Sequence, residues 1–460
     1  MKEIILAIDC GTTNLKAALF DYKLNCMISG ETALEYLKKD TISAEFQGKK
    51  VWQTLKGLII DLAASAGIKT ERINKISITG QANSITILDD KFDEIMPFIS
   101  WLDIRSKKES RLIYERFKGK FQQHCSIKEP RPGMAVSKLL WLKKHNPEVL
   151  DGDGKLISFL SYIAMMFTSS FVTEPNTAAL EGIYSIPENK WRQEILDYIG
   201  INAAQLPEII TTGSHIPVIR QKSGLPLPGG IKVIFAGNDQ TANAVANDLE
   251  NRNIIINLGT ALVLYRKMGI RMGPFGEDSI WGPYPEGGFY EMYCDRFGTN
   301  AVDWALNELL YSGDIQEFIK LASSRKYTTD SNIFFYPSKI GSNCLWKGDG
   351  NREQKARAVF EGMCFYIKDK LESLFKVSDL EYSLTLTGGG SKNSYWSQMI
   401  ADVLGKEISL TSGDTLLGCA KLAVKGSRLP GTRQVDRFHP DKKKTEWFNK
   451  QFKKWSDLNA

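Results

Sequence analysis

The chain has 460 residues, of which 43% are hydrophobic and 24% are charged, and its formal net charge is +6. This composition excludes disordered, collagen-like and low-complexity classes, and the length predicts two large domains or three small ones. The seven cysteines are scattered, with no closely spaced pair, so we expect reduced thiols in a cytoplasmic protein rather than disulfides or a zinc site. Because the positive charge is spread along the chain, no nucleic-acid partner is predicted.

The apolar stretches are too short for membrane targeting. Five apolar residues follow Glu3, which is fewer than a signal peptide needs. The most membrane-like stretch, Leu156 to Val172, is interrupted by serines and is shorter than the roughly 20 residues of a spanning helix. We therefore expect a buried helix there and no membrane partner.

A weak internal repeat is the most informative feature of the sequence. Apolar residues 4–8 lead into the turn Asp9–Thr13, and a second apolar stretch follows at residues 15–20. Past the midpoint, residues 254–256 lead into Asn257–Thr260, followed by residues 261–265. Both patterns predict a hairpin with a glycine-threonine turn, and together they predict a duplicated domain.

Three further predicted strands lead into glycine turns: residues 76–79, 233–236 and 384–387. Helices are predicted after the last two, over residues 240–249 and 394–404. Strands that alternate with helices of this length indicate an α/β fold with buried sheets. We expect domains at residues 1–245 and 246–430, and a basic helical tail at 431–460. The tail helix, over Lys442–Lys454, carries one apolar stripe and one lysine face.

The first turn has the composition of a phosphate cradle. Glycine lets the backbone approach a phosphate closely, and threonine adds a hydroxyl donor. Lys16 could offset charge on a transferred group, and Asp9 could hold Mg²⁺ through water. The alternative is an ordinary tight hairpin with a surface lysine.

The triple glycine at Gly388–Gly390 lies between a predicted strand and a predicted helix. A flat ligand could lie against this backbone at the helix N-terminus, where free N–H groups point outward. The alternative is a glycine-rich loop that only turns the chain.

Asp239 follows a buried strand and Gly237, so that its carboxylate would face a cleft at the strand ends. Phosphoryl transfer to an alcohol needs such a group to accept the hydroxyl proton. From the residues alone, a helix N-cap is the favoured alternative.

Trp101, Asp103 and Arg105 combine an aromatic face, a carboxylate and a guanidinium, which suits a polyhydroxylated ligand; a surface ion pair beside a core tryptophan is the alternative. There is no Walker-type phosphate loop and no protein-kinase His-Arg-Asp motif, so those two ATP-binding designs are excluded. The chain has four histidines, none near a partner motif, which argues against a histidine-based hydrolase or metal site.

In this order, the motifs resemble the FGGY family of carbohydrate kinases, within the actin-like ATPase superfamily. The likeness covers nearly the whole chain and includes Thr173–Ala178, Leu206–Ile209, Ala356–Gly362 and Phe438–Pro440. It implies two ribonuclease-H-like domains that flank a central cleft, with ATP and Mg²⁺ as cofactors. The implied substrate is a small sugar or polyol, and we expect a ketose of five to seven carbons.

The resemblance also implies roles for individual residues. Asp239 takes the position of the catalytic base, and Asp9 and Asp239 lie closest to the metal. The sugar would contact Gln81, Asn83, Trp101, Asp103, Arg105, Asp239 and Gln240. The nucleotide phosphates would contact Thr12, Thr13, Asn14, Lys16, Gly259 and Thr260, and the adenosine would contact Gly389, Gly390 and Asn393.

The chain departs from its relatives at several positions. Ala82 and Asn83 replace larger or charged residues beside the glycine-glutamine turn, so the substrate cannot be copied from xylulose or glycerol kinases. Ala246 and Asp248 replace two glycines, and residues 336–341 replace a common loop motif. A degenerate sensor of sugar or nucleotide is therefore one alternative, and an actin-like filament protein is another; a homodimer is left open.

Overall fold

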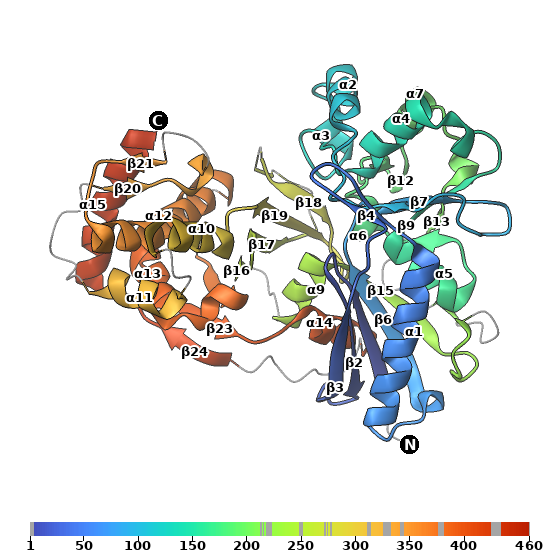
Figure 1. Cartoon of the computed structure of the whole chain (residues 1–460), viewed down its shortest axis with the longest axis horizontal. Helices are drawn as coiled ribbons and strands as arrows, with labels where there is room; N and C mark the ends of the chain where they lie inside the picture. Colours follow the sequence, from blue (N-terminus) through green and yellow to red (C-terminus); the bar gives the residue numbers. More distant parts are fainter. Residues whose placement is uncertain are drawn as a thin grey trace. The chain divides into compact units, whose positions relative to one another are not determined.

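The structure is a computed structural model. It describes residues 4–211, 214, 216–217, 223–247, 252–270, 273, 275–276, 278–310, 314–324, 333–340, 345–375, 381–424 and 434–459; Asp248 and Cys344 lie outside these ranges. The chain forms two compact units (Figure 1). The first comprises Met1–Asp248, Trp281–Tyr290 and Gly413–Gly431, and the second comprises Leu249–Ile280, Glu291–Ser412 and Thr432–Ala460.

The first unit is built on a six-stranded sheet of order β14-β15-β6-β1-β2-β3. β1 pairs antiparallel with β2 and parallel with β6, which pairs parallel with β15. All seven residues of β1 are buried, because helices cover the sheet on both faces. The strands are β1 (Ile4–Cys10), β2 (Asn14–Asp21), β3 (Cys26–Ala33), β6 (Ile73–Gly80), β14 (Ile216–Pro217) and β15 (Lys232–Asn238).

Two pairs of helices cover this sheet. The helices α1 (Gly48–Ser65) and α5 (Phe159–Thr168) share a hydrophobic core with Ile4, Leu6 and Ile8 of β1. The helices α9 (Asp239–Ala246) and α14 (Thr415–Ala423) pack against each other and against β6 and β15. Because side chains alternate along a strand, Asp9 points to the α14 side of the sheet, away from Ile8.

A smaller sheet of order β4-β5-β8-β7-β9 extends the first unit. The helices α2 (Lys107–Phe117) and α4 (Ala135–His145) lie beside it (Figure 1). Its strands are β4 (Lys38–Lys39), β5 (Ala44–Phe46), β7 (Ile85–Leu88), β8 (Phe98–Ile99) and β9 (Lys155–Ser158).

The second unit is built on a sheet whose strands run in the order β19-β17-β16-β22-β23-β24. They are β16 (Asn253–Leu258), β17 (Leu262–Met268), β19 (Phe289–Asp295), β22 (Ser383–Thr387), β23 (Ile408–Thr411) and β24 (Gln434–Phe438). The strand β18 (Ile280–Pro283) belongs to the first unit except for Ile280. The helices are α10 (Thr299–Leu310), α11 (Ile315–Ser323), α12 (Arg352–Phe375), α13 (Ser394–Leu404) and α15 (Lys442–Asn459).

The predicted duplication is confirmed by the strand orders. The series β3-β2-β1-β6-β15-β14 in the first unit matches β19-β17-β16-β22-β23-β24 in the second. In both, an antiparallel hairpin adjoins two parallel strands and an antiparallel edge strand. The α/β fold with two ribonuclease-H-like domains is therefore the observed fold class.

The buried helix predicted over Leu156–Val172 is only partly correct. That stretch begins in β9, continues as α5 and ends in a short strand, β10 (Val172–Thr173). Ser169 closes α5 in a left-handed conformation, with φ of 60°. The prediction is wrong at both ends because a segment buried on all sides lacks the periodicity that distinguishes a strand from a helix.

The tail helix α15 has the predicted apolar stripe, because Phe448 and Trp455 are buried in the core of the second unit. The sequence predicts one domain over residues 246–430, whereas the segment 413–431 groups with the first unit. The six cysteines within the described residues are free thiols, as predicted. Of the helices that the structure describes, none is both long and apolar enough to cross a membrane.

We predict that Gly418→Ala destabilises the protein. A Cβ atom on Gly418 would lie 1.8 Å from the carbonyl oxygen of Ala242 in α9, and such overpacking costs about 1–3 kcal/mol. The matched control is Gly57→Ala in α1, where no atom lies within 4 Å of the added Cβ; there the helix should gain stability. Thermal unfolding of both variants checks this, and equal midpoints would contradict the packing argument.

Candidate active site

The carboxyl ends of three parallel strands meet at one edge of the sheet in the first unit. Asp9 lies opposite Thr79, and both Cys10 and Asn238 lie opposite Gly80. The turn after β1, the turn after β6 and the start of α9 therefore emerge side by side. In open α/β sheets this edge is where ligands bind.

The turn after β6 holds the Asp9–Thr13 turn in place. A Cβ atom on Gly80 would lie 2.4 Å from the carbonyl oxygen of Cys10, so only glycine fits there. The backbone N–H of Gln81 donates to that same oxygen at 3.0 Å. The side-chain amide of Gln81 donates to the Gly11 oxygen at 3.0 Å and accepts from the Ser84 hydroxyl at 2.7 Å.

Asp239 is the first residue of α9 but does not cap the helix. The cap is Asn238, whose side chain accepts from the N–H groups of Gln240 and Thr241. Asp239 is half-buried and accepts the Gln240 N–H at 2.9 Å. Burial and then the negative charge of Asp9 raise the pKa of Asp239 to about 7. The carboxyl group can therefore exchange a proton near neutral pH.

Asp9 has one satisfied and one unsatisfied oxygen. Its Oδ2 accepts from the hydroxyl of Thr415, at the start of α14, at 2.6 Å. Its Oδ1 is buried and has no hydrogen-bond partner among the described residues. Burial raises the pKa of Asp9. A buried carboxylate oxygen without a donor is suited to a cation ligand, either directly or through water.

Few acidic side chains of the described residues could bind a cation at this position. Within the described residues, no three His, Cys, Asp or Glu side chains cluster around a common point. Mg²⁺ is commonly held by one or two carboxylates together with substrate phosphates and water. Asp9, with Asp239 nearby, fits that pattern.

The predicted aromatic platform adjoins the predicted phosphate turn. The indole N–H of Trp101 donates to the Thr12 hydroxyl at 2.8 Å, while 43% of Trp101 stays exposed. Thr13 is exposed and Asn14 is half-buried. The side chain of the half-buried Lys16 is 45% exposed, so its ammonium is accessible to an anion, although it lies 4.0 Å from a carboxylate oxygen of Glu31.

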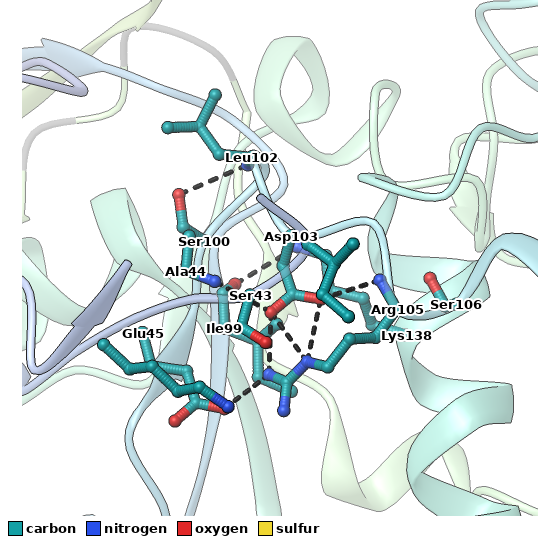
Figure 2. Close-up of polar contacts among 12 residues, drawn as sticks. Ser43, Ala44, Glu45, Ile99, Ser100, Leu102, Asp103, Arg105, Ser106 and Lys138 are labelled. Atoms are coloured by element: carbon teal, nitrogen blue, oxygen red, sulfur yellow. Dashed lines mark hydrogen bonds and ion pairs between the residues drawn. The ribbon is translucent and has the colours of Figure 1, made fainter. Parts of the chain in front are cut away.

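Asp103 and Arg105 bind each other rather than facing solvent. Figure 2 shows the two side chains paired, with Glu45 beside the guanidinium. Asp103 is 1% exposed and also accepts the Ala44 N–H at 3.1 Å. The Asp103 carboxylate is therefore buried and paired with the half-buried Arg105, and their contact with a sugar stays a prediction.

Asn83 adopts a left-handed conformation, with φ of 66°, which asparagine tolerates better than most residues. Its side-chain oxygen accepts the Ala135 N–H at the start of α4, at 3.1 Å. Its backbone oxygen accepts from Lys138, a buried lysine that the sequence patterns do not single out.

In the second unit, the triple glycine packs against the second hairpin. A Cβ atom on Gly388 would lie 2.7 Å from the carbonyl oxygen of Leu258, which repeats the approach of Gly80 to Cys10. The N–H of Thr299 donates to the Gly259 oxygen at 2.8 Å, and that of Gly298 donates to the Thr260 oxygen at 3.1 Å. The start of α10 thus fixes this turn.

A pocket of about 440 Å³ opens beside the triple glycine. Gly389, Gly390 and Asn393 line it, and the Asn393 side chain caps α13. Apart from Lys392, which belongs to the glycine-rich turn, the other lining residues come from α10, α11, α12 and α13, and those from α10, α11 and α12 lie too far along the chain for a local motif to predict them. The other lining residues are Thr299, Val302, Asp303, Ile315, Gln316, Ile319, Phe360, Lys392, Ser394, Tyr395 and Trp396.

Two models of one protein family together match most of the chain. Residues 4–246 match the N-terminal domain of the FGGY family of carbohydrate kinases, and residues 256–427 match the C-terminal domain of that family. The xylulose kinase of Lactococcus lactis is 25% identical, over 88% of this chain and 83% of its own length.

Solved structures have the same fold. A xylulose kinase from Rhodospirillum rubrum superposes with a TM-score of 0.91 at 19% identity, over 99% of this chain and 98% of its own. A gluconate kinase from Lactobacillus acidophilus gives a TM-score of 0.89 at 22% identity, over 100% and 98% of the two chains.

We predict that Asp239→Asn stabilises the metal-free protein at high pH. With a pKa near 7 instead of 3.8, the folded state keeps a proton that the unfolded chain releases between about pH 4 and 7. The stability contributed by this group therefore falls as the pH rises through that window. In EDTA, the unfolding midpoint of the variant should exceed that of the parent above pH 7, and the two should converge near pH 4. A constant difference would contradict the raised pKa.

Proposed function

This chain belongs to the FGGY family of carbohydrate kinases, and we propose that it phosphorylates a hydroxyl of a ketose of five to seven carbons, with Asp239 as general base. The observation that carries this proposal is the position of Asp239 at the carboxyl end of β15, beside Asp9, with a pKa of about 7. A base whose pKa lies near the working pH is the most effective one for proton transfer.

In this proposal the turn Asp9–Thr13 receives the phosphates. Its backbone and the Thr12 and Thr13 hydroxyls supply donors without bulk, and Lys16 offsets negative charge on the transferred group. Mg²⁺ would be held by Asp9 and the phosphates, with Asp239 close by, and it would neutralise charge on the phosphate oxygens.

The sugar would lie on the exposed ring of Trp101, within reach of Asp239 and Gln240. The polar groups of Gln81, Asn83, Asp103 and Arg105 bond within the protein, so we assign them mainly to shaping this site. The xylulose kinases among the relatives favour a five-carbon ketose, whereas the gluconate kinase is a reason to include sugar acids in any substrate panel.

The pocket in the second unit would bind adenosine. Its volume of about 440 Å³ lies within the range of small-ligand sites, and Phe360, Tyr395 and Trp396 give it apolar walls. Gly389 carries no side chain, so a flat base can lie against the backbone. Gly259 and Thr260 would bind the phosphates from this unit.

We predict that Asp239→Asn lowers kcat by about 10²–10⁴-fold, which is the usual contribution of a general base. The KM for the sugar should change little, because asparagine keeps the shape of the side chain. A coupled ADP-release assay with MgATP over ketoses, sugar acids and polyols measures both constants. The control is Asp89→Asn, in a surface turn of the same unit, which should keep the kcat of the parent.

Two outcomes of this assay would contradict the proposal. A near-parental kcat for Asp239→Asn would show that another group is the base. No ADP release by the parent with any substrate, together with sugar or nucleotide binding in thermal-shift experiments, would favour the sensor alternative.

We predict that Gly389→Val raises the KM for ATP by about tenfold or more. The Cβ position of Gly389 has no atom within 4 Å, so the added side chain can project into the pocket without disturbing the fold. The KM for the sugar and the unfolding midpoint should stay near those of the parent. An unchanged KM for ATP would place the adenosine elsewhere.

A further inference from the structure

A buried lysine, Lys138 of α4, connects the two segments that flank the proposed sugar site. It is 1% exposed. Its ammonium donates to the backbone oxygen of Asn83 at 2.5 Å and to that of Ile99 at 3.1 Å. Asn83 follows the Gly80–Gln81 turn, and Ile99 is the last residue of β8, two residues before Trp101. One side chain thus joins the β6 turn to the segment that carries the aromatic ring.

Two further contacts make the junction specific. The Asn83 side chain accepts the Ala135 N–H in the first turn of α4, at 3.1 Å. The helix α4 therefore contacts the turn after β6 through both Ala135 and Lys138. The backbone N–H of Trp101 donates to the Ser84 hydroxyl at 3.1 Å, so the same turn also contacts the segment of Trp101 directly. Between these contacts, the backbone at Asn83 keeps a left-handed conformation.

Burial removes the Lys138 ammonium from water, which is unfavourable for its charged form. Burial lowers its pKa to about 7, although Asp103 and Glu181 face it and favour the charged form, while Arg105 opposes it. The Asp103 carboxylate is already paired with Arg105, and burial raises the pKa of Glu181 to about 8. The closest partners of the ammonium are therefore the two backbone oxygens, as Figure 2 shows for Ile99.

We propose that Lys138 is a positioning residue for the sugar: it fixes the turn Gln81–Ser84 against the segment Ile99–Arg105 and so sets the place of the Trp101 ring. This inference rests on the proposed function of that site. Without the ammonium, the buried carbonyl group of Ile99 and the part-buried carbonyl group of Asn83 lose this donor, which is costly enough to rearrange one of the segments. The sugar site should deform, whereas the adenosine pocket lies in the other unit and should not.

The test compares Lys138→Met with Lys368→Met in the full-length chain. Lys368, in α12 of the second unit, also donates to a backbone oxygen, that of Val403 at 3.2 Å, and its side chain is 11% exposed. With xylulose as the probe, Lys138→Met should raise the KM for the sugar about tenfold or more and leave the KM for ATP within about twofold. Lys368→Met should keep both constants, even if its unfolding midpoint falls.

A lower unfolding midpoint for Lys138→Met with an unchanged KM for xylulose would reduce Lys138 to a structural role and overturn the inference. If the methionine variant does not fold, Lys138→Gln replaces it in the comparison with Lys368→Met. Glutamine keeps an N–H donor, so the KM for xylulose should rise, but by less than is expected for methionine. If the parent phosphorylates no substrate, the proposed function fails separately. Calorimetric dissociation constants for sugars, compared between the parent and Lys138→Met, then test the role of Lys138. The absence of sugar binding to the parent would overturn both the proposed function and this inference.

Discussion

In the first unit, β1, β6 and β15 pair in parallel, and Cys10 and Asn238 both lie opposite Gly80. This register depends on a residue without a side chain at position 80, because the Cys10 oxygen occupies the space of a Cβ atom. It brings the carboxylates of Asp9 and Asp239 close enough for their charges to interact. Burial is the largest cause of the raised pKa of the proposed base, and the charge of Asp9, which this strand pairing brings near, adds to it.

The sequence predicts those parts of the site that depend on short-range patterns. The hairpin turns, the glycine after β6, the start of α9 and the Asn393 cap all follow from local alternation and turn chemistry. Thr415 could not be found in this way, because it contacts Asp9 across 406 positions. The sequence pattern indicates polar chemistry at Asp103 and Arg105, but tertiary packing determines which groups these two side chains contact.

The duplicated sheets use the same close approach for different chemistry. Gly388 packs against Leu258 as Gly80 packs against Cys10, yet Asn257 stands where the first unit has Asp9. An amide neither attracts a cation strongly nor repels a neighbouring carboxylate. The acidic pair is therefore confined to the first unit, while the second offers a neutral turn and a partly apolar pocket.

The contact between α9 and α14 has a consequence for synthesis. The first unit consists of residues 1–248 together with segments that follow much later, up to residue 431. At about 5–20 residues per second, a ribosome needs roughly 10–35 s to make the ~170 residues that separate the two helices. Until then, the face of the sheet that α14 covers stays open in the nascent chain. Completion of the first unit therefore waits until α14 has been made, and chaperones have that interval in which to bind the uncovered strands.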